Sequence, residues 1–323
     1  MKKVLLLDPS IATINTGDEI IKVSIERNFP ELFETNYIYR LPTHTHTFSK
    51  LQLMLYPNKK HQFQSADYTF LCGTNALYVN MLRPMPTWNI NFWNSTLLKN
   101  VICLGVGCGQ NSTKANSYTK RLYRKVLSKD VIHSVRDEYT ETFLCEMGFK
   151  ALNTGCPTLW GFTPEKCRTI NNVKNNNVIF TLTNYTPDIQ NDVAMIDILF
   201  RNYENVYFWP QSISDLDYLE SITDKRPHII APNLNKYDEI LTSKIDYVGN
   251  RLHGGIFSMQ HGNRSIIISI DNRARHMKES YDLPIIERNN IQEELEPLIN
   301  STWNTELTIN FQTIKTWKDQ FEF

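Results

Sequence analysis

The sequence lacks three features that would place it in a specialised class of protein: a net charge, a long apolar run and a paired-cysteine motif. Its 34 lysines and arginines balance 34 aspartates and glutamates, so no global basic field exists to hold nucleic acid, and any anion site must be local. No apolar run approaches the roughly 20 residues that span a bilayer. The six cysteines form no C-x-x-C pair, so we expect them to be reduced and mostly buried in a cytoplasmic protein.

What the chain does have is enough apolar material for a sizeable core. Its 323 residues suit one large domain or two ordinary ones, and 41% of them are hydrophobic. The first ten residues, MKKVLLLDPS, begin like a signal peptide, but Asp8 and Pro9 end the apolar run too early. A first β-strand at residues 3–7 is therefore expected.

Apolar strands alternate with amphipathic helices along most of the chain, which predicts parallel, doubly wound α/β sheets. A polar, asparagine-rich stretch at residues 161–177 divides the pattern into two halves. We therefore expect an N-terminal lobe at residues 1–165 and a C-terminal lobe at 166–323. A last helix near residues 311–321 is a candidate to pack back on the first lobe. The expected strands are 68–72, 101–105, 131–135, 178–182, 206–209, 228–231, 246–248 and 265–270.

The most informative stretch is residues 247–275, YVGNRLHGGIFSMQHGNRSIIISIDNRAR. Alternate residues of an extended segment point the same way, so Arg251 and His253 can face one pocket. Gly254 removes a side chain where the backbone must turn or approach a ligand. A short helix at residues 256–260 would aim its N-terminus at the pocket, which suits an anion.

The apolar strand that follows delivers two more guanidiniums, those of Arg273 and Arg275, at its C-terminal end. Three arginines and one histidine at the rim of a strand–turn–helix–strand unit predict a site for a small, highly charged anion.

Two further turns follow strands in the first half. The turn that holds Asn15, Gly17 and Asp18 offers capping oxygens and free backbone N–H groups, either to an ordinary helix or to a ligand. Arg136 follows the strand at residues 131–135, at the sheet edge where α/β proteins bind ligands. A salt bridge with the acidic residues after it is the ordinary alternative.

Neither a cofactor nor a metal is expected. The glycines at 105, 107 and 109 imitate a dinucleotide-binding turn, but the spacing is G-x-G-x-G and no acid closes the next strand. His44 and His46 stand two apart in a polar segment at residues 40–64, with no acidic or cysteine partner nearby. That segment is expected to be a surface loop.

Three blocks of the chain resemble the polysaccharide pyruvyl transferase family. They are the N-x-G-D turn at residues 15–18, the V-R-D block with its Gly-x-Pro turn at 135–157, and the G-x-R-x-H-G block at 247–275. The resemblance implies two Rossmann-like lobes in a glycosyltransferase-B-like arrangement, with the site in the inter-lobe cleft. It implies transfer of a pyruvyl group from phosphoenolpyruvate, as donor substrate, to a sugar of a surface or secreted polysaccharide or its precursor, forming a ketal.

On this resemblance His253 is expected to be a general acid, because attack at C2 of phosphoenolpyruvate requires protonation of its C3 methylene. A core histidine bonded to a backbone carbonyl is the ordinary alternative. Asp18 is expected to orient or deprotonate the acceptor hydroxyl. The other expected substrate contacts outside the arginines are Asn15, Gly17, Leu252 and Gly254.

Arg136, Arg251 and Arg273 are expected to bind the phosphate and the carboxylate of the donor, since guanidinium forks bind both groups bidentately. The family commonly has lysine where this chain has Arg273. A planar fork and an ammonium are not interchangeable, so Arg275 is an alternative for the same role.

Two other functions stay open. The same scaffold suits a glycosyltransferase that uses a nucleotide-activated sugar, and it suits a non-catalytic protein that binds an anionic glycan or sugar phosphate. The acceptor sugar and the ketal position are not readable from the sequence. A lipid-linked acceptor is a further alternative, which would place the protein at the inner face of a membrane without insertion.

Overall fold

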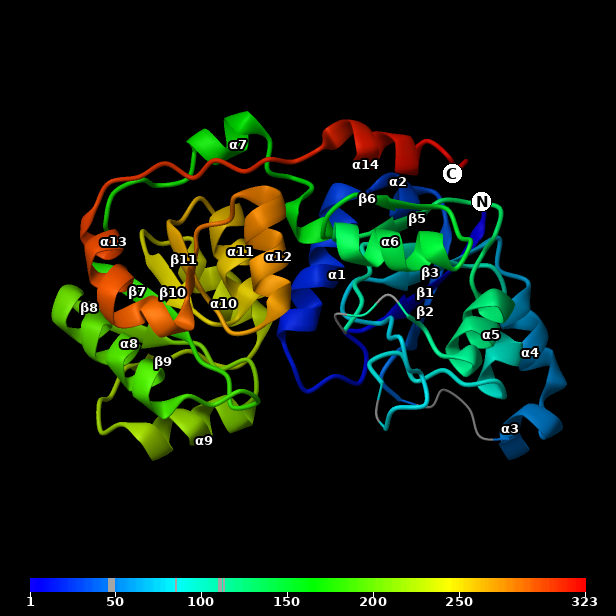
Figure 1. Cartoon of the computed structure of the whole chain (residues 1–323), viewed down its shortest axis with the longest axis horizontal. Helices are drawn as coiled ribbons and strands as arrows, with labels where there is room; N and C mark the ends of the chain where they lie inside the picture. The colour runs from blue at the N-terminus through cyan, green and yellow to red at the C-terminus, as the bar shows by residue number, and fades with distance from the viewer. Residues whose placement is uncertain (46–49, 85, 110–111, 113) are drawn as a thin grey trace. The chain divides into compact units, whose positions relative to one another are not determined.

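The computed structural model describes residues 1–45, 50–84, 86–109, 112 and 114–323 (Figure 1). The chain forms two compact units. Unit 1 comprises Met1–Thr13, Ile21–Trp160 and Asn310–Phe323, and unit 2 comprises Ile14–Ile20 and Gly161–Ile309. Each unit has a parallel sheet with helices, so the α/β class with two Rossmann-like units is confirmed. The boundary at residues 165 and 166 and the inter-lobe cleft stay predictions.

The sheet of unit 1 has the strand order β2-β1-β3-β4, with every pair parallel. The parallel pair β5-β6 continues from it through a bridge between Val106 and Val135. The strands are β1 (Lys3–Asp8), β2 (Tyr37–Pro42), β3 (Tyr68–Cys72), β4 (Val101–Leu104), β5 (His133–Val135) and β6 (Ala151–Asn153).

Helix α14 (Phe311–Lys318) belongs to unit 1 although it follows unit 2 in the chain. Trp317 of this helix is fully buried, with its ring edge-on to those of Phe29 and Phe70 at 5.7 and 6.1 Å. The other helices of this unit are α1 (Gly17–Asn28), whose first turn groups with unit 2, α2 (Glu31–Glu34), α3 (Lys50–Leu55), α4 (Pro57–Gln64), α5 (Ser117–Val126), α6 (Glu138–Glu146) and the short turns η1 (Asn94–Leu97) and η2 (Pro157–Leu159).

The six-stranded sheet of unit 2 has the order β12-β11-β10-β7-β8-β9, again all parallel. The strands are β7 (Asn177–Thr181), β8 (Asn205–Phe208), β9 (His228–Ile229), β10 (Asp246–Gly249), β11 (Ser265–Ser269) and β12 (Ile285–Glu287). Numbered within the unit, this is the 3-2-1-4-5-6 order of doubly wound folds. Such sheets bind ligands at the switch point where the strand order reverses, which here lies between the carboxyl ends of β7 and β10.

Most helices of unit 2 connect these strands, while the first helix precedes the sheet in the chain and the last one follows it. They are α7 (Pro164–Arg168), α8 (Ile189–Asn202), α9 (Ile213–Ile222), α10 (Leu234–Leu241), α11 (Leu252–Gln260), α12 (Asn272–Tyr281) and α13 (Glu296–Asn300), with the turns η3 (Arg288–Asn290) and η4 (Ile291–Leu295). Among the described residues no helix is long and apolar enough to cross a membrane.

Three expectations about elements are wrong. The described part of residues 40–64 holds the end of β2 and the helices α3 and α4 instead of a surface loop, and His46 lies outside the described residues. The helix expected at residues 256–260 begins four residues earlier. Helix α12 occupies the stretch that was expected to be a basic turn, because Asp271 caps its N-terminus and Ala274, Met277 and Tyr281 form a buried stripe at helical spacing.

The cysteines are free, and most of them are buried as expected. Only Cys145 is exposed among the six, all of which lie in the described part of the chain.

Candidate functional site

The turn after β10 is shaped by the close approach of β7. A Cβ added to Gly249 would lie 2.3 Å from the Thr181 Oγ1 and 2.7 Å from the Thr181 backbone, so only glycine fits at this strand end. The chain then passes through Asn250 to Arg251, the N-cap residue of α11. The switch point of unit 2 therefore carries the residues of the expected anion site.

His253 lies in the first turn of α11 and not in an extended segment, so the alternation argument that paired it with Arg251 does not apply. The glycines let this helix pack closely on the sheet. A Cβ on Gly255 would lie 2.6 Å from the Ile267 Cγ1 and 2.8 Å from the Tyr247 Cε1. The first-turn backbone N–H groups of the helix are those that an α-helix leaves without intrahelical partners, so they suit an anion.

Arg251 is held in place by a buried ion pair. Its Nη2 donates to both carboxylate oxygens of Asp215 at 2.6 Å, and its Nε donates to the Leu182 carbonyl at 3.2 Å. Asp215 is fully buried in α9. Nε and Nη2 thus fix the guanidinium, so the arginine is oriented before any ligand arrives.

Asp215 connects three loops at the carboxyl edge of the sheet. Besides Arg251, it accepts backbone N–H bonds from Gln211 and Ser212, both at 3.2 Å, and from Asn184 at 3.3 Å. The loop after β7, the loop after β8 and the turn after β10 are thereby fixed to one carboxylate. This hub was not predicted, because its members are far apart in the sequence.

Tyr185 joins the two arginines of the site. The Arg251 guanidinium lies 5.1 Å from the centre of the Tyr185 ring, and Tyr185 is also close enough to Arg273 to act on the charge of that guanidinium. Burial lowers the pKa of Arg273, but Asp271, Tyr185 and Asp18 outweigh it and raise this pKa above its ordinary value. Tyr185 therefore connects Arg251 with Arg273, and Asp18 acts on the charge of Arg273, while the roles expected of these three residues stay predictions.

The turn before α1 is hydrogen-bonded to the loop after β8, which also holds Gln211. The Thr16 N–H and hydroxyl both donate to the Gln211 carbonyl at 3.1 Å, and the Gly17 N–H donates to the Asn15 Oδ1 at 3.2 Å. Asp18 lies in the first helical turn and is buried. The two ends of the family pattern, more than 230 residues apart, thus meet at one loop of unit 2.

Gln211 occupies the space between the two glycines of the expected site. A Cβ on Gly17 would lie 2.7 Å from the Gln211 Oε1, and a Cβ on Gly254 would lie 3.1 Å from the Gln211 Nε2. The side chain is 3% exposed, and its Nε2 has no hydrogen-bond partner among the described residues. Sequence reasoning missed this residue, because a single glutamine after a strand carries no recognisable signal.

Two expected site residues are directed elsewhere. Arg275 is half-exposed and donates from Nε to the Glu287 carboxylate at 2.9 Å, whereas Arg273 points to Tyr185 and Asp271. The Leu252 side chain is buried in the core, which leaves only its backbone for a ligand.

Arg136 lies in unit 1, at the end of β5. Its Nε donates to the Asp137 carboxylate at 3.3 Å, its Nη2 donates to the Asn75 side chain, and its guanidinium covers Gly107, where a Cβ would lie 2.4 Å from the Arg136 Cζ. The salt bridge that the sequence offered as the ordinary alternative is therefore present. Its suggested role toward a ligand stays a prediction.

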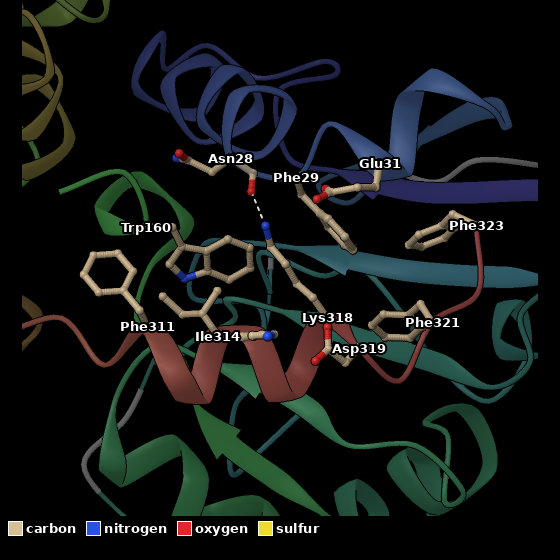
Figure 2. A pocket seen from close by; sticks show the side chains of 11 residues that line it. Asn28, Phe29, Glu31, Trp160, Phe311, Ile314, Lys318, Asp319, Phe321 and Phe323 are labelled. Carbon is tan, nitrogen blue, oxygen red and sulfur yellow. Dashed lines mark hydrogen bonds between the residues drawn. The ribbon is translucent and has the colours of Figure 1, made fainter. Parts of the chain in front are cut away.

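Two cavities in the described part of the chain contain none of the expected site residues. One, of about 570 Å³, lies in unit 1 beside α14, where Lys318 donates to the Asn28 carbonyl and faces the rings of Phe29 and Trp160 (Figure 2). The other, of about 630 Å³, lies in unit 2 between residues 164–172 and 304–308. No group of three or more metal-ligating side chains occurs among the described residues.

The fold and this geometry define a class: a doubly wound α/β protein with a buried, ion-paired arginine at the switch point of its second sheet. The family profile for polysaccharide pyruvyl transferases matches residues 15–272, which is most of the chain. The chain therefore belongs to the polysaccharide pyruvyl transferase family. The matched span includes Asp18, Arg136, Arg251 and His253, and it ends one residue before Arg273. A comparison with curated proteins finds no match.

Proposed function

We propose that the protein transfers a pyruvyl group from phosphoenolpyruvate to two hydroxyls of a sugar, forming a cyclic ketal. The observation that carries the proposal is that Tyr185 connects Arg251 with Arg273, whose charge Asp18 also affects, while the Gln211 side chain lies between Gly17 and Gly254, the neighbours of Asp18 and His253. Phosphoenolpyruvate has a phosphate and a carboxylate on one small frame, and two guanidiniums with a helix N-terminus match both anions.

In the proposed reaction His253 protonates the C3 methylene, and C2 gains oxocarbenium character. A sugar hydroxyl adds to C2 and gives up its proton, phosphate leaves with its bridging oxygen, and a second hydroxyl adds and closes the ketal. One hydroxyl proton replaces the proton delivered to C3, and the other is released with the phosphate. Asp18 would orient or deprotonate the acceptor hydroxyl, as a buried carboxylate beside Arg273 can.

His253 is half-buried, which suits a group that must reach a substrate and still be partly shielded from water. Arg251 is fixed by Asp215 and offers the rigid part of the anion site, while Arg273 offers the second guanidinium. Arg136 belongs to the proposal through the family pattern alone. The acceptor would be a polysaccharide or its precursor, with lipid linkage as an open alternative.

The first test separates binding from catalysis. Thermal unfolding with and without phosphoenolpyruvate should show stabilisation, which amounts to about 2.7 kcal/mol at a ligand concentration one hundred times Kd. The Arg273→Gln variant should lose this shift, and the matched Arg275→Gln variant should keep it. Stabilisation by nucleotides and not by phosphoenolpyruvate would favour the nucleotide-sugar transferase instead.

The second test measures catalytic turnover. Phosphate release from phosphoenolpyruvate in the presence of candidate glycans, with mass spectrometry for an added pyruvyl unit, should fall by ~10²–10⁴-fold in His253→Ala. The exposed His228 of unit 2 provides the control, since His228→Ala should keep wild-type turnover. Turnover of His253→Ala within about threefold of wild type would remove this histidine from the general-acid role.

A further inference from the structure

The zero net charge of the chain conceals a strong separation of charge. Between Glu34 and Asp130 the sequence has twelve lysines and arginines and a single acidic residue, Asp67. Residues 35–129 therefore carry a formal charge of +11, and the rest of the chain carries −11. The whole segment belongs to unit 1, so this unit has a basic region that the overall balance does not predict.

The same region exposes large apolar side chains. Leu51, Met54 and Leu55 of α3 are 65%, 76% and 63% exposed, and Tyr56, which follows the helix, is 58% exposed. Elsewhere in the described part of the chain, exposed large apolar residues occur singly along the sequence. Four within six residues make a patch that a soluble surface rarely carries without a partner.

The elements that carry these apolar and basic residues lie together in unit 1. Helix α3 contacts α4, α4 contacts η1, and η1 contacts α5, and Figure 1 shows α3, α4 and α5 together at one end of the unit. Lys60 of α4 and Lys120 and Arg124 of α5 are exposed. We call this the α3–α5 face.

An exposed tryptophan adds to this face. Trp93 is 53% exposed and comes directly before η1. The residue before it, Phe92, accepts a hydrogen bond on its carbonyl from the Lys125 Nζ of α5 at 2.9 Å. Tryptophan and tyrosine side chains beside lysines and arginines are the combination found where proteins meet the interface of a membrane.

We propose that the α3–α5 face binds the surface of an anionic lipid bilayer. Lysines and arginines near such a surface are attracted by its negative potential, and leucine and methionine side chains gain by entering the acyl boundary. Nucleic acid would match the charge but not the exposed aliphatic side chains, which neither pair with phosphates nor stack on bases. The inference does not depend on the donor or the acceptor proposed above.

Sedimentation with vesicles tests this directly. The protein should sediment with phosphatidylcholine vesicles that contain phosphatidylglycerol, much less with phosphatidylcholine alone, and less at high salt. Lys60→Glu with Lys120→Glu should lower the partition coefficient at least tenfold, because each basic residue near the surface contributes a factor of about five. Leu51→Asn with Leu55→Asn should also lower it at least tenfold while the response to salt remains.

Two matched variants in unit 2 serve as controls. Ile189→Asn removes an isolated exposed apolar side chain and Lys278→Glu reverses an exposed charge, and neither should alter vesicle binding. Equal binding to neutral and anionic vesicles, or equal binding by the face variants and the controls, would overturn the proposal. So would tighter binding to duplex DNA at the same salt that only the lysine variants weaken. Turnover with a soluble acceptor should be unchanged in all four variants, so this inference and the proposed reaction fail separately.

Discussion

The two units of the protein place an arginine at the carboxyl end of a parallel strand in different ways. Arg136 follows β5 and pairs with Asp137, its neighbour in the chain, while Arg251 follows β10 and pairs with Asp215, 36 residues earlier. Both guanidiniums are largely buried. The first pair is local and lies at a helix N-cap, whereas the second connects three loops of unit 2 at the carboxyl edge of its sheet.

The histidines near these two arginines also differ in how deeply they are buried. His133 of β5 is fully buried, its Nδ1 accepts from the Cys103 N–H at 3.0 Å, and its Nε2 lies 2.9 Å from the Ser128 carbonyl. Burial lowers the pKa of His133 to about 4. His133 thus shows the arrangement, a core histidine bonded to a backbone carbonyl, that the sequence offered as the alternative for the half-buried His253.

Removal of the two aspartates should separate the local pair from the long-range one. Asp215→Ala leaves the buried Arg251 charge uncompensated and three backbone N–H groups without their acceptor, so it should lower the free energy of unfolding by about 3–5 kcal/mol. Asp137→Ala removes the N-cap bond to the Thr140 N–H and the carboxylate that pairs with the buried Arg136, which keeps its bond to Asn75. That variant should cost about 2–3 kcal/mol, less than Asp215→Ala because no loop depends on Asp137 for several backbone bonds.

Urea unfolding followed by tryptophan fluorescence measures both variants. A loss for Asp215→Ala no larger than that for Asp137→Ala would mean that the long-range pair does not organise the loops of unit 2. The Asp215→Ala variant should in addition lose the thermal shift with phosphoenolpyruvate, because its Arg251 is no longer oriented.

Features that depend on residues close together in the sequence could be predicted from it, whereas contacts between distant segments could not. The α/β class, the cysteines and most strands of both sheets depend on local apolar runs, so they were predictable. The turn at Asn15–Asp18 and the Arg251 turn were found as motifs, but their meeting through Gln211 was not, because contacts between distant segments leave no periodic signal. Helix α12 was not predicted, although Ala274, Met277 and Tyr281 have helical spacing, because Arg273 and Arg275 were interpreted as the end of the preceding strand.

The buried histidine of unit 1 gives a pH-dependent prediction. Its folded pKa lies below the ordinary 6.5, so the unfolded chain binds the proton more tightly, and stability is present above pH 6.5 and is lost as the pH falls toward 4. The full contribution is about 3 kcal/mol. Comparison of urea unfolding at pH 7.5 and 4.5 should show a smaller loss for His133→Phe than for wild type. The control variant His228→Phe, at an exposed position, should lose as much free energy of unfolding between the two pH values as wild type. Equal losses in all three proteins would contradict the low pKa of His133.

The smallest expected change in stability concerns the Gln211 amide, and here the substitution should stabilise the protein. The Gln211→Leu variant keeps the backbone bonds to Asp215 and Thr16 and removes only the side-chain amide. Because the Nε2 is buried without a partner, its removal should raise the free energy of unfolding by about 1 kcal/mol. The amide fills the space between Gly17 and Gly254, so its loss should also alter the spacing between Asp18 and His253.

A polar group kept at a cost in stability between two segments of a site is expected to act on function. We expect kcat for Gln211→Leu to fall about tenfold, which is about 1.4 kcal/mol in the activation free energy, with a small change in the KM for phosphoenolpyruvate. The Gln211→Glu variant keeps the size and should place a charge beside Asp18, so it should be less stable than wild type. A Gln211→Leu enzyme that is more stable and fully active would show that the amide only fills space. A loss of stability in Gln211→Leu would instead show that the Gln211 amide has a hydrogen-bond partner in solution. The end of β5 with Arg136 and the end of β10 with Arg251 would then differ only in their ion pairs.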